Sequence, residues 1–234
     1  MSHDVRTPIN GIQGCVDIAD RYPDDLKLQQ EARTKIRTAS GYLLNLVNDV
    51  LDMNKLESGN IQLERKHFNL LEVLHNTNEI TRMQANESGV NYYVEDGEII
   101  HTQLIGSPVH FQQILMNIGS NAVKYNQDGG SVTVSCREVS YTDTTAEYEL
   151  TCTDTGIGMS EEFQKKAFEP FAQEGQSART KYAGTGLGLA IAKKLIELQG
   201  GTLFFESIQG KGTKFILHIS FEISAEEQKK KFHM

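Results

Sequence analysis

The sequence predicts an α+β fold in which an N-terminal antiparallel helical hairpin precedes an α/β layer. Two observations carry this prediction. From Val5 to Met53, apolar residues recur at alternating steps of four and three, which is typical of amphipathic helices that pack along a seam. From Ile61 onward, short strand-like runs alternate with amphipathic helices. The 234 residues are enough for one large or two modest domains.

Composition and charge exclude several classes of protein. With 38% hydrophobic and 23% charged residues, the chain can form a packed core and wholesale disorder is not expected. The net charge of -8 argues against nucleic-acid binding. No signal peptide is recognisable, and no apolar run approaches the ~18 residues that a membrane span needs. The three cysteines are far apart and lack ligand-like spacing, so we expect buried thiols in a reducing compartment.

The first helix is predicted from a polar and an apolar face. His3 lies on the polar face, opposite the apolar stripe, and only two residues precede it. Pro8 lies inside the pattern and should bend the helix just after His3. Residues 22–25 end this helix and cap the next one. The apolar stripe consists of Val5, Ile9, Ile12, Val16 and Ala19.

The second helix has an apolar face that is wider than one hairpin can bury. One row is Ala32, Ile36, Ala39, Leu43, Leu46, Val50 and Met53, and a second row is Leu44, Val47 and Leu51. Either two hairpins form a four-helix bundle in a dimer, which we favour, or the following residues cover the excess. Gly59 is expected just beyond the end of this helix.

The remaining elements are expected to alternate. Ser107 is predicted to cap a helix that begins at Pro108. Residues 209–212 should join the last two strands as a hairpin. The tail at 225–234 is charged. The predicted strands are 61–63, 90–94, 131–137, 147–153, 202–207 and 213–221, and the predicted helices are 70–88, 108–125 and 187–199.

Three motifs could carry chemistry. Gly184-Thr-Gly-Leu-Gly-Leu-Ala190 leads directly into a helix, whose first N–H groups can bind an anion. It is not a dinucleotide-binding fingerprint, because Leu189 stands where the third glycine belongs, and no Walker A motif occurs. Asp154-Thr-Gly-Ile-Gly-Met159 follows a strand and is either a simple turn or a carboxylate that receives an exocyclic amine beside a flat ring.

The third motif places two amides and an ammonium on one helix face. Asn117, Asn121 and Lys124 lie at positions i, i+4 and i+7 of an otherwise apolar helix. They are either solvated surface residues or part of a site for Mg²⁺ and phosphate, since Mg²⁺ prefers oxygen ligands and takes many of them from phosphates and water.

Together these motifs resemble those of sensor histidine kinases. Asn117-x3-Asn121, Asp154-x-Gly-x-Gly158, Phe168-Glu-Pro-Phe171, Gly184-x-Gly-x-Gly188 and Gly212-Thr-Lys-Phe215 look like the N, G1, F and G2 boxes and the closing Gly-Thr-x-Phe of that family. Ser2-His-Asp-Val-Arg-Thr-Pro8 looks like its phosphoacceptor box. The resemblance covers almost the whole chain. One departure is Ser107, where the family more often has Asp; Ser also caps helices, so no loss of function is expected.

The resemblance implies a dimerisation and phosphoacceptor hairpin at residues 1–60 and an ATP-binding α/β sandwich of the Bergerat (GHKL) fold at 61–224. Gyrase, mismatch-repair ATPases and the heat-shock chaperone share that fold. Residues 172–186 would form a mobile ATP lid with Phe168 and Phe171 at its root. The implied ATP-binding residues are Asn117, Asn121, Lys124, Tyr125, Asp154, Gly156, Gly158, Phe171, Gly184, Thr185, Gly186, Leu187, Gly188, Leu189 and Thr213.

Within that set the resemblance implies separate roles. Asp154 would bind the adenine amino group with help from Thr213. Asn121 would bind Mg²⁺, and Asn117 and Lys124 would contact phosphates or metal.

The implied activity is ATP- and Mg²⁺-dependent autophosphorylation of His3, followed by transfer to an aspartate of a response regulator receiver domain. Asp4 would hold the proton on the other ring nitrogen of His3. Thr7 either orients water for dephosphorylation of the regulator or bonds to the helix backbone. The implied protein is a homodimer and a cytoplasmic piece of a membrane-bound sensor, without nucleic-acid or membrane contact in this stretch.

Two other functions remain open. An ATPase or chaperone-type clamp would need a general base, and such relatives carry Glu where this chain has Asn117, an amide that cannot accept a proton near neutral pH. A catalytically weak nucleotide-binding dimeric relay would keep the same motifs.

Overall fold

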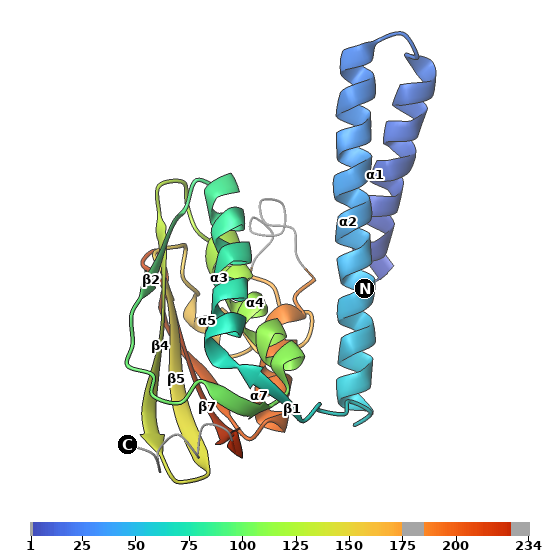
Figure 1. The fold of residues 1–234 in the computed structure, drawn as a ribbon. Coiled ribbons are helices and arrows are strands. Elements are labelled where there is room, and N and C mark those ends of the chain that lie inside the picture. Colours follow the sequence, from blue (N-terminus) through green and yellow to red (C-terminus); the bar gives the residue numbers. More distant parts are fainter. Residues whose placement is uncertain (1, 175–184, 226–234) are drawn as a thin grey trace.

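The computed structural model of the protein describes residues 2–174 and 185–225, except for the side chains of residues 2–4. A long helical hairpin stands beside an α/β layer, which confirms the predicted fold class (Figure 1). No helix in the described ranges is both long and apolar enough to cross a membrane. The elements are α1 (Ser2–Arg21), α2 (Leu26–Glu57), β1 (Lys66–Asn69), α3 (Leu70–Glu87), β2 (Asn91–Glu95), β3 (Gln103–Gly106), α4 (Pro108–Lys124), β4 (Ser131–Tyr141), β5 (Thr145–Asp154), α5 (Glu161–Gln164), α7 (Gly188–Leu198), β6 (Thr202–Ile208) and β7 (Gly212–Ile223).

The hairpin turns where the sequence predicts it. Asp25 caps α2, because its carboxylate accepts the backbone N–H groups of Lys27 and Leu28 at 3.1 and 3.0 Å. Helix α1 continues through Pro8 without interruption. Gly59, just beyond α2, has a φ of 68°, the left-handed conformation expected after a helix end.

The α/β layer covers only one end of the wide apolar face of α2. Met53 and Leu56 belong to the same hydrophobic core as the sheet. In contrast, Leu44, Val47 and Leu51 are 61%, 45% and 50% exposed. The middle of the hairpin therefore keeps an apolar surface that nothing within the described chain covers.

One mixed sheet of seven strands has the order β1-β3-β7-β5-β4-β2, with β6 also paired to β7. All neighbours are antiparallel except β2 and β4. Figure 1 shows α3, α4 and α7 packed as a layer against this sheet. The largest fully buried side chains of this core include Tyr148, Phe111, Leu70, Leu195 and Ile196.

One local expectation is wrong, and a second is confirmed in position but not in its hydrogen bond. The predicted strand at 61–63 is absent, and the first strand is Lys66–Asn69. Ile61 instead packs against the core from an irregular segment, so its burial explains the apolar pattern. Ser107 occupies the N-cap position of α4 but makes no capping hydrogen bond. Its hydroxyl lies 2.7 Å from His110 Nδ1.

Candidate functional site

A cavity of about 280 Å³ lies between the middle of α2, one face of α4, the end of β5 and the start of α7. Residues of α5 and β7 also line it, so elements that are distant in the sequence contribute to one space. Most of the residues predicted to bind ATP line it, namely Asn117, Asn121, Lys124, Tyr125, Asp154, Gly158, Thr185, Gly186, Gly188, Leu189 and Thr213.

Asp154 ends β5 and is only 7% exposed. Its Oδ1 atom accepts the backbone N–H groups of Gly156 at 2.8 Å and Thr213 at 3.3 Å. Burial raises the pKa of this carboxyl group to about 6, although the two backbone hydrogen bonds act in the opposite direction. At neutral pH the group is mostly ionised, so it can accept a hydrogen bond from an amine in the cavity. Gly156 is required beside it, since a Cβ there would lie 2.3 Å from the carbonyl oxygen of Tyr125.

The polar face of α4 points into the same cavity, as the spacing predicts. Burial lowers the pKa of Lys124 to about 8, so its ammonium is still mostly charged at neutral pH. Its Nζ atom donates to the Tyr125 hydroxyl at 3.1 Å and stands 4.6 Å from the centre of that ring. The Asn117 Nδ2 atom is buried and has no hydrogen-bond partner among the described residues. An unpaired buried amide costs ~1–3 kcal/mol, which a polar ligand in the cavity would offset.

Helix α7 begins at Gly188, against the amides of α4. A Cβ at Gly188 would lie 3.6 Å from Asn117 Oδ1 and 3.8 Å from Asn121 Nδ2. The N-cap residue Leu187 makes no side-chain capping bond. The N–H groups of the first turn of α7 therefore lie next to two amides, and the Lys124 ammonium lines the same cavity, an arrangement suited to a phosphate group.

Some predicted residues do not line the cavity. Leu187 is fully buried in the core. The Phe171 ring is 43% exposed, and this residue, with a φ of 63°, instead donates its backbone N–H to Gly186 O at 3.0 Å. Phe168 packs its ring 5.4 Å from that of Phe205. Gly184 lies outside the described residues, as do positions 175–184 of the predicted lid.

The predicted phosphoacceptor lies on α1. The side chains of His3 and Asp4 are outside the described set, and Thr7 is exposed. Because the hairpin turns at residues 22–25, the backbone of His3 lies opposite the region of Leu44 on α2. Figure 1 shows the start of α1 beside the middle of α2. No described residue of α1 lines the cavity.

Sequence reasoning missed the part of α2 that forms a cavity wall, which consists of Tyr42, Asn45 and Asp49. The Thr185 hydroxyl donates to Asp49 Oδ2 at 2.7 Å and accepts from the Leu187 N–H at 3.2 Å. Burial raises the pKa of Asp49, and the hydrogen bond from Thr185 opposes that shift. These contacts join segments more than a hundred positions apart, so no local pattern indicated them.

Two family models match the chain. One, described as "Histidine kinase-, DNA gyrase B-, and HSP90-like ATPase", matches residues 106–223. The chain belongs to this ATPase family. The second, "His Kinase A (phospho-acceptor) domain", matches residues 1–59 and precedes the ATPase match. The order of the two matches is that of a sensor histidine kinase core, which confirms the resemblance in the sequence.

Relatives of this histidine kinase core extend well beyond it. It is 32% identical over 223 residues to the sensory/regulatory protein RpfC of Xanthomonas campestris pathovar campestris, covering 95% of this chain and 31% of RpfC. It is 31% identical over 224 residues to the signal transduction histidine-protein kinase BarA of Escherichia coli K12, covering 96% of this chain and 24% of BarA. The chain thus spans about a third or less of these relatives.

A solved structure has the same fold. The crystal structure of full-length ShkA in complex with AMPPNP matches with a TM-score of 0.69 and 26% identity, covering 97% of this chain and 46% of ShkA.

Proposed function

We propose that the chain autophosphorylates His3 with ATP and passes the phosphoryl group to an aspartate in the receiver domain of a response regulator. The observation that carries this proposal is the cavity itself. It brings together a buried carboxylate, an unpaired amide and a helix N-terminus. The helix that bears His3 packs against α2, and α2 also forms one wall of the cavity.

The nucleotide would span this cavity from the end of β5 to the start of α7. Asp154 accepts a hydrogen bond from the adenine amino group. The backbone N–H of Thr213 donates to the same carboxylate and holds it in place. At the other end, Lys124 and the first N–H groups of α7 bind the phosphates. The crystal structure of ShkA in complex with AMPPNP supports nucleotide binding by a protein of this fold.

Mg²⁺ would be held chiefly by the Asn121 amide oxygen, with Asn117 beside it. No group of three His, Cys, Asp or Glu side chains suited to a metal lies within the described residues. Amide oxygens together with phosphates and water fit Mg²⁺, which often takes few ligands from the protein. Bound Mg²⁺ would neutralise charge that develops on the transferring group.

In the proposed step, a neutral His3 ring nitrogen attacks the γ-phosphorus of ATP in line. An N–P bond forms, the bond to the ADP oxygen breaks, and Asp4 accepts the proton from the other ring nitrogen. Since α2 rather than α1 lines the cavity, the step requires either a shift of the hairpin or His3 of the partner subunit.

The proposed activity implies a division of the chain into domains. Residues 1–60 form the dimerisation and phosphoacceptor domain, residues 61–224 the ATP-binding domain, and residues 225–234 a charged tail. The exposed row Leu44, Val47 and Leu51 supports a dimer. We place the protein in the cytoplasm, in keeping with its free cysteines. Thr7 would orient water when the regulator is dephosphorylated.

The test is incubation with γ-labelled ATP and Mg²⁺. The chain should acquire label that is lost in acid and kept in base, because a phosphoramidate is acid-labile. His3→Ala should abolish the label, whereas His67→Ala, which alters an exposed histidine on β1, should leave it unchanged. Acid-stable label, or label that survives in His3→Ala, would contradict the proposal.

ATP hydrolysis is the second candidate function, because the cavity also contains the carboxylates of Asp49 and Glu174. Glu174 accepts the N–H of Ser160 at 2.8 Å, so its position is fixed. Phosphate release that continues in His3→Ala and stops in Glu174→Gln would favour an ATPase. Release that stops in His3→Ala would favour the kinase.

A further inference from the structure

A second cavity, of about 290 Å³, lies between α3 and the sheet. Leu115, Ile118 and Gly119 line it from the side of α4 opposite the nucleotide cavity. The strands β4, β5 and β7 form its floor. The proposed kinase activity uses none of this space.

The cavity exists because small side chains stand where a core would hold large ones. Thr77 and Thr81 on α3, Gly119 on α4 and Ser135 on β4 all line it. The hydroxyl groups bond elsewhere: Thr77 to Val73 O at 2.8 Å, Thr81 to Thr77 O at 2.9 Å, and Ser135 with the Thr151 hydroxyl at 2.8 Å. The remaining surface is mainly carbon and thiol, and an apolar cavity of this kind favours an apolar occupant over water.

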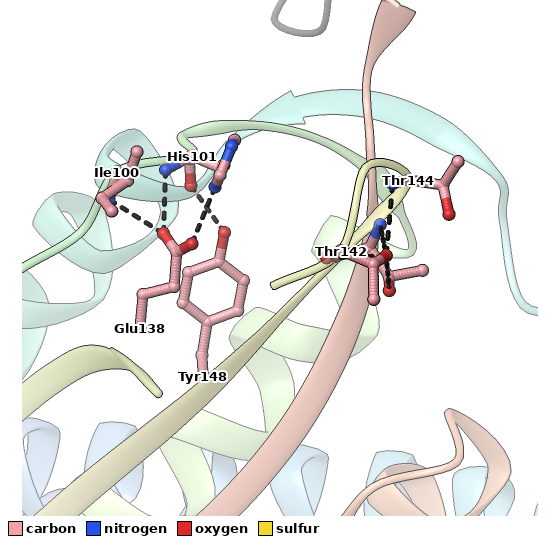
Figure 2. Close-up of polar contacts among 7 residues, drawn as sticks. Ile100, His101, Glu138, Thr142, Thr144 and Tyr148 are labelled. Atoms are coloured by element: carbon pink, nitrogen blue, oxygen red, sulfur yellow. Dashed lines mark hydrogen bonds and ion pairs between the residues drawn. The ribbon is translucent and has the colours of Figure 1, made fainter. Parts of the chain in front are cut away.

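One wall of the cavity is fixed in advance. Residues Gly97 and Ile99 line it, and the segment that follows is clamped to β4. The Glu138 carboxylate accepts the N–H groups of Ile100 and His101 at 2.8 and 2.9 Å and lies 2.7 Å from His101 Nδ1 (Figure 2). The Tyr148 hydroxyl donates to His101 O at 2.6 Å. Because the side chains of His101 and Glu138 are only 4% and 3% exposed, these bonds hold the segment in place and the wall is preorganised for a ligand.

The rim of the cavity is acidic. Glu95 and Asp96 are exposed and line its mouth with His75, and the lining residues that the structure describes include no lysine or arginine. Leu71 is 48% exposed at the same rim. A carboxylate ligand would be repelled there, whereas an ammonium group would be attracted.

We propose that this cavity binds a small aromatic molecule that is neutral or singly cationic. The ring lies between α3 and the sheet, and the cationic group lies at Glu95 and Asp96. A cavity of about 150 Å³ holds benzene, so 290 Å³ is suited to a two-ring compound. Phe215 lines both cavities, and an occupant would therefore contact a wall of the nucleotide site.

The probes are indole, tryptamine and indole-3-acetate, which share one ring and differ in charge. The chain contains no tryptophan, so indole fluorescence reports only the probe. Each titration of the 234-residue chain should saturate, with tryptamine bound most tightly and indole-3-acetate at least about fivefold more weakly than tryptamine. Excess Mg²⁺ and AMPPNP should not displace indole, which separates this cavity from the nucleotide site.

Three variants locate the binding. Thr77→Leu fills the cavity from α3 and should weaken indole binding about tenfold or more, without a lower melting temperature. Thr77→Val keeps the shape of the side chain and should retain binding. Glu95→Gln combined with Asp96→Asn alters only exposed side chains and should remove the preference for tryptamine over indole.

Four results would overturn the proposal: displacement of indole by AMPPNP, titrations that do not saturate, unchanged binding in Thr77→Leu, or tightest binding of indole-3-acetate. A tryptamine preference that survives the rim substitutions would also contradict the placement of the cation. These measurements need no phosphorylation, so their outcome is independent of the kinase assignment.

Discussion

At the level of single residues, burial sets the pH range in which the two ends of the nucleotide cavity are both charged. Asp154 and Lys124 both lose solvent, which raises the pKa of the acid to about 6 and lowers the pKa of the base to about 8. Each group still carries its charge near neutral pH. The cavity therefore keeps a hydrogen-bond acceptor at one end and a cation at the other in a limited pH range.

We predict that nucleotide affinity is greatest between about pH 6 and pH 8. Below that range Asp154 is protonated and no longer accepts a hydrogen bond from the adenine amine. Above it Lys124 is neutral and no longer attracts the phosphates. Calorimetric titration with ADP across the range checks this prediction. Asp154→Asn should remove the acid limb that remains after correction for phosphate protonation, and Lys124→Met should remove the alkaline limb. A flat profile would contradict both roles.

Asp154→Asn should also stabilise the nucleotide-free protein. The folded-state pKa of about 6 exceeds the usual 3.8, so the folded state binds the proton more tightly than the unfolded state. The protonated carboxyl contributes fully to stability only below about pH 3.8. That contribution is lost as the pH rises to about 6 and beyond. The variant should gain about 1–2 kcal/mol at about pH 7.5 and less than half of that at about pH 4.5 in urea denaturation. A loss of stability at the higher pH would contradict the burial argument.

The sequence indicates these residues because their motifs are local. Asp154 with Gly156 and Gly158 lies in one turn, and Asn117 with Asn121 lies on one helix face. Asp49 is different, since its partner Thr185 is 136 positions away and depends on how α2 packs. The Ser107 hydroxyl does not make the capping bond that the sequence predicts, because it pairs with His110 Nδ1 instead.

At the level of elements, α2 acts as a wall of the nucleotide cavity. Asp49 contacts Thr185 at the start of α7, and Asp52 accepts the Gln113 side-chain amide of α4 at 2.8 Å. Of these two aspartates, Asp49 lines the cavity and Asp52 does not. Its carboxylate therefore stands near the space proposed for the phosphates, where like charges repel.

We predict that Asp49→Asn increases ATP affinity about threefold, because it removes a negative charge near the phosphates and keeps an acceptor for Thr185. Equilibrium binding of ATP at low salt gives the measurement. Asp52→Asn is the matched control and should leave the affinity unchanged, since its carboxylate lies outside the cavity. Weaker binding in Asp49→Asn would show that the carboxylate instead supports the nucleotide site.

At the level of the whole molecule, the exposed apolar row of Leu44, Val47 and Leu51 on α2 is a surface that the described residues of one chain leave uncovered. We predict that Val47→Glu combined with Leu51→Glu converts a dimer to a monomer in sedimentation velocity, because two charges would enter an apolar interface. Val109→Glu, at a 60% exposed position on α4, is the control and should remain dimeric. A parent chain that is already monomeric would contradict the four-helix bundle.

Most of the fold follows from periodicity, and the exceptions have physical causes. The helices and the last hairpin have long, regular patterns, so their positions are predictable. The strand β3 has only four residues, and its pairing with β1 and β7 is set by the sheet rather than by its own pattern. The second cavity is not predictable, because it depends on which small side chains face one another across the core.

The position of β7 determines when this protein can fold during its synthesis. β7 pairs with β3, β5 and β6 and carries Thr213 and Phe215 in the nucleotide cavity. It is also the last described element of the chain. The helical hairpin can form early on the ribosome, but β3 and β5 must wait with unpaired edges until Ile223 has emerged. The nucleotide site is therefore completed only after β7 has left the ribosome.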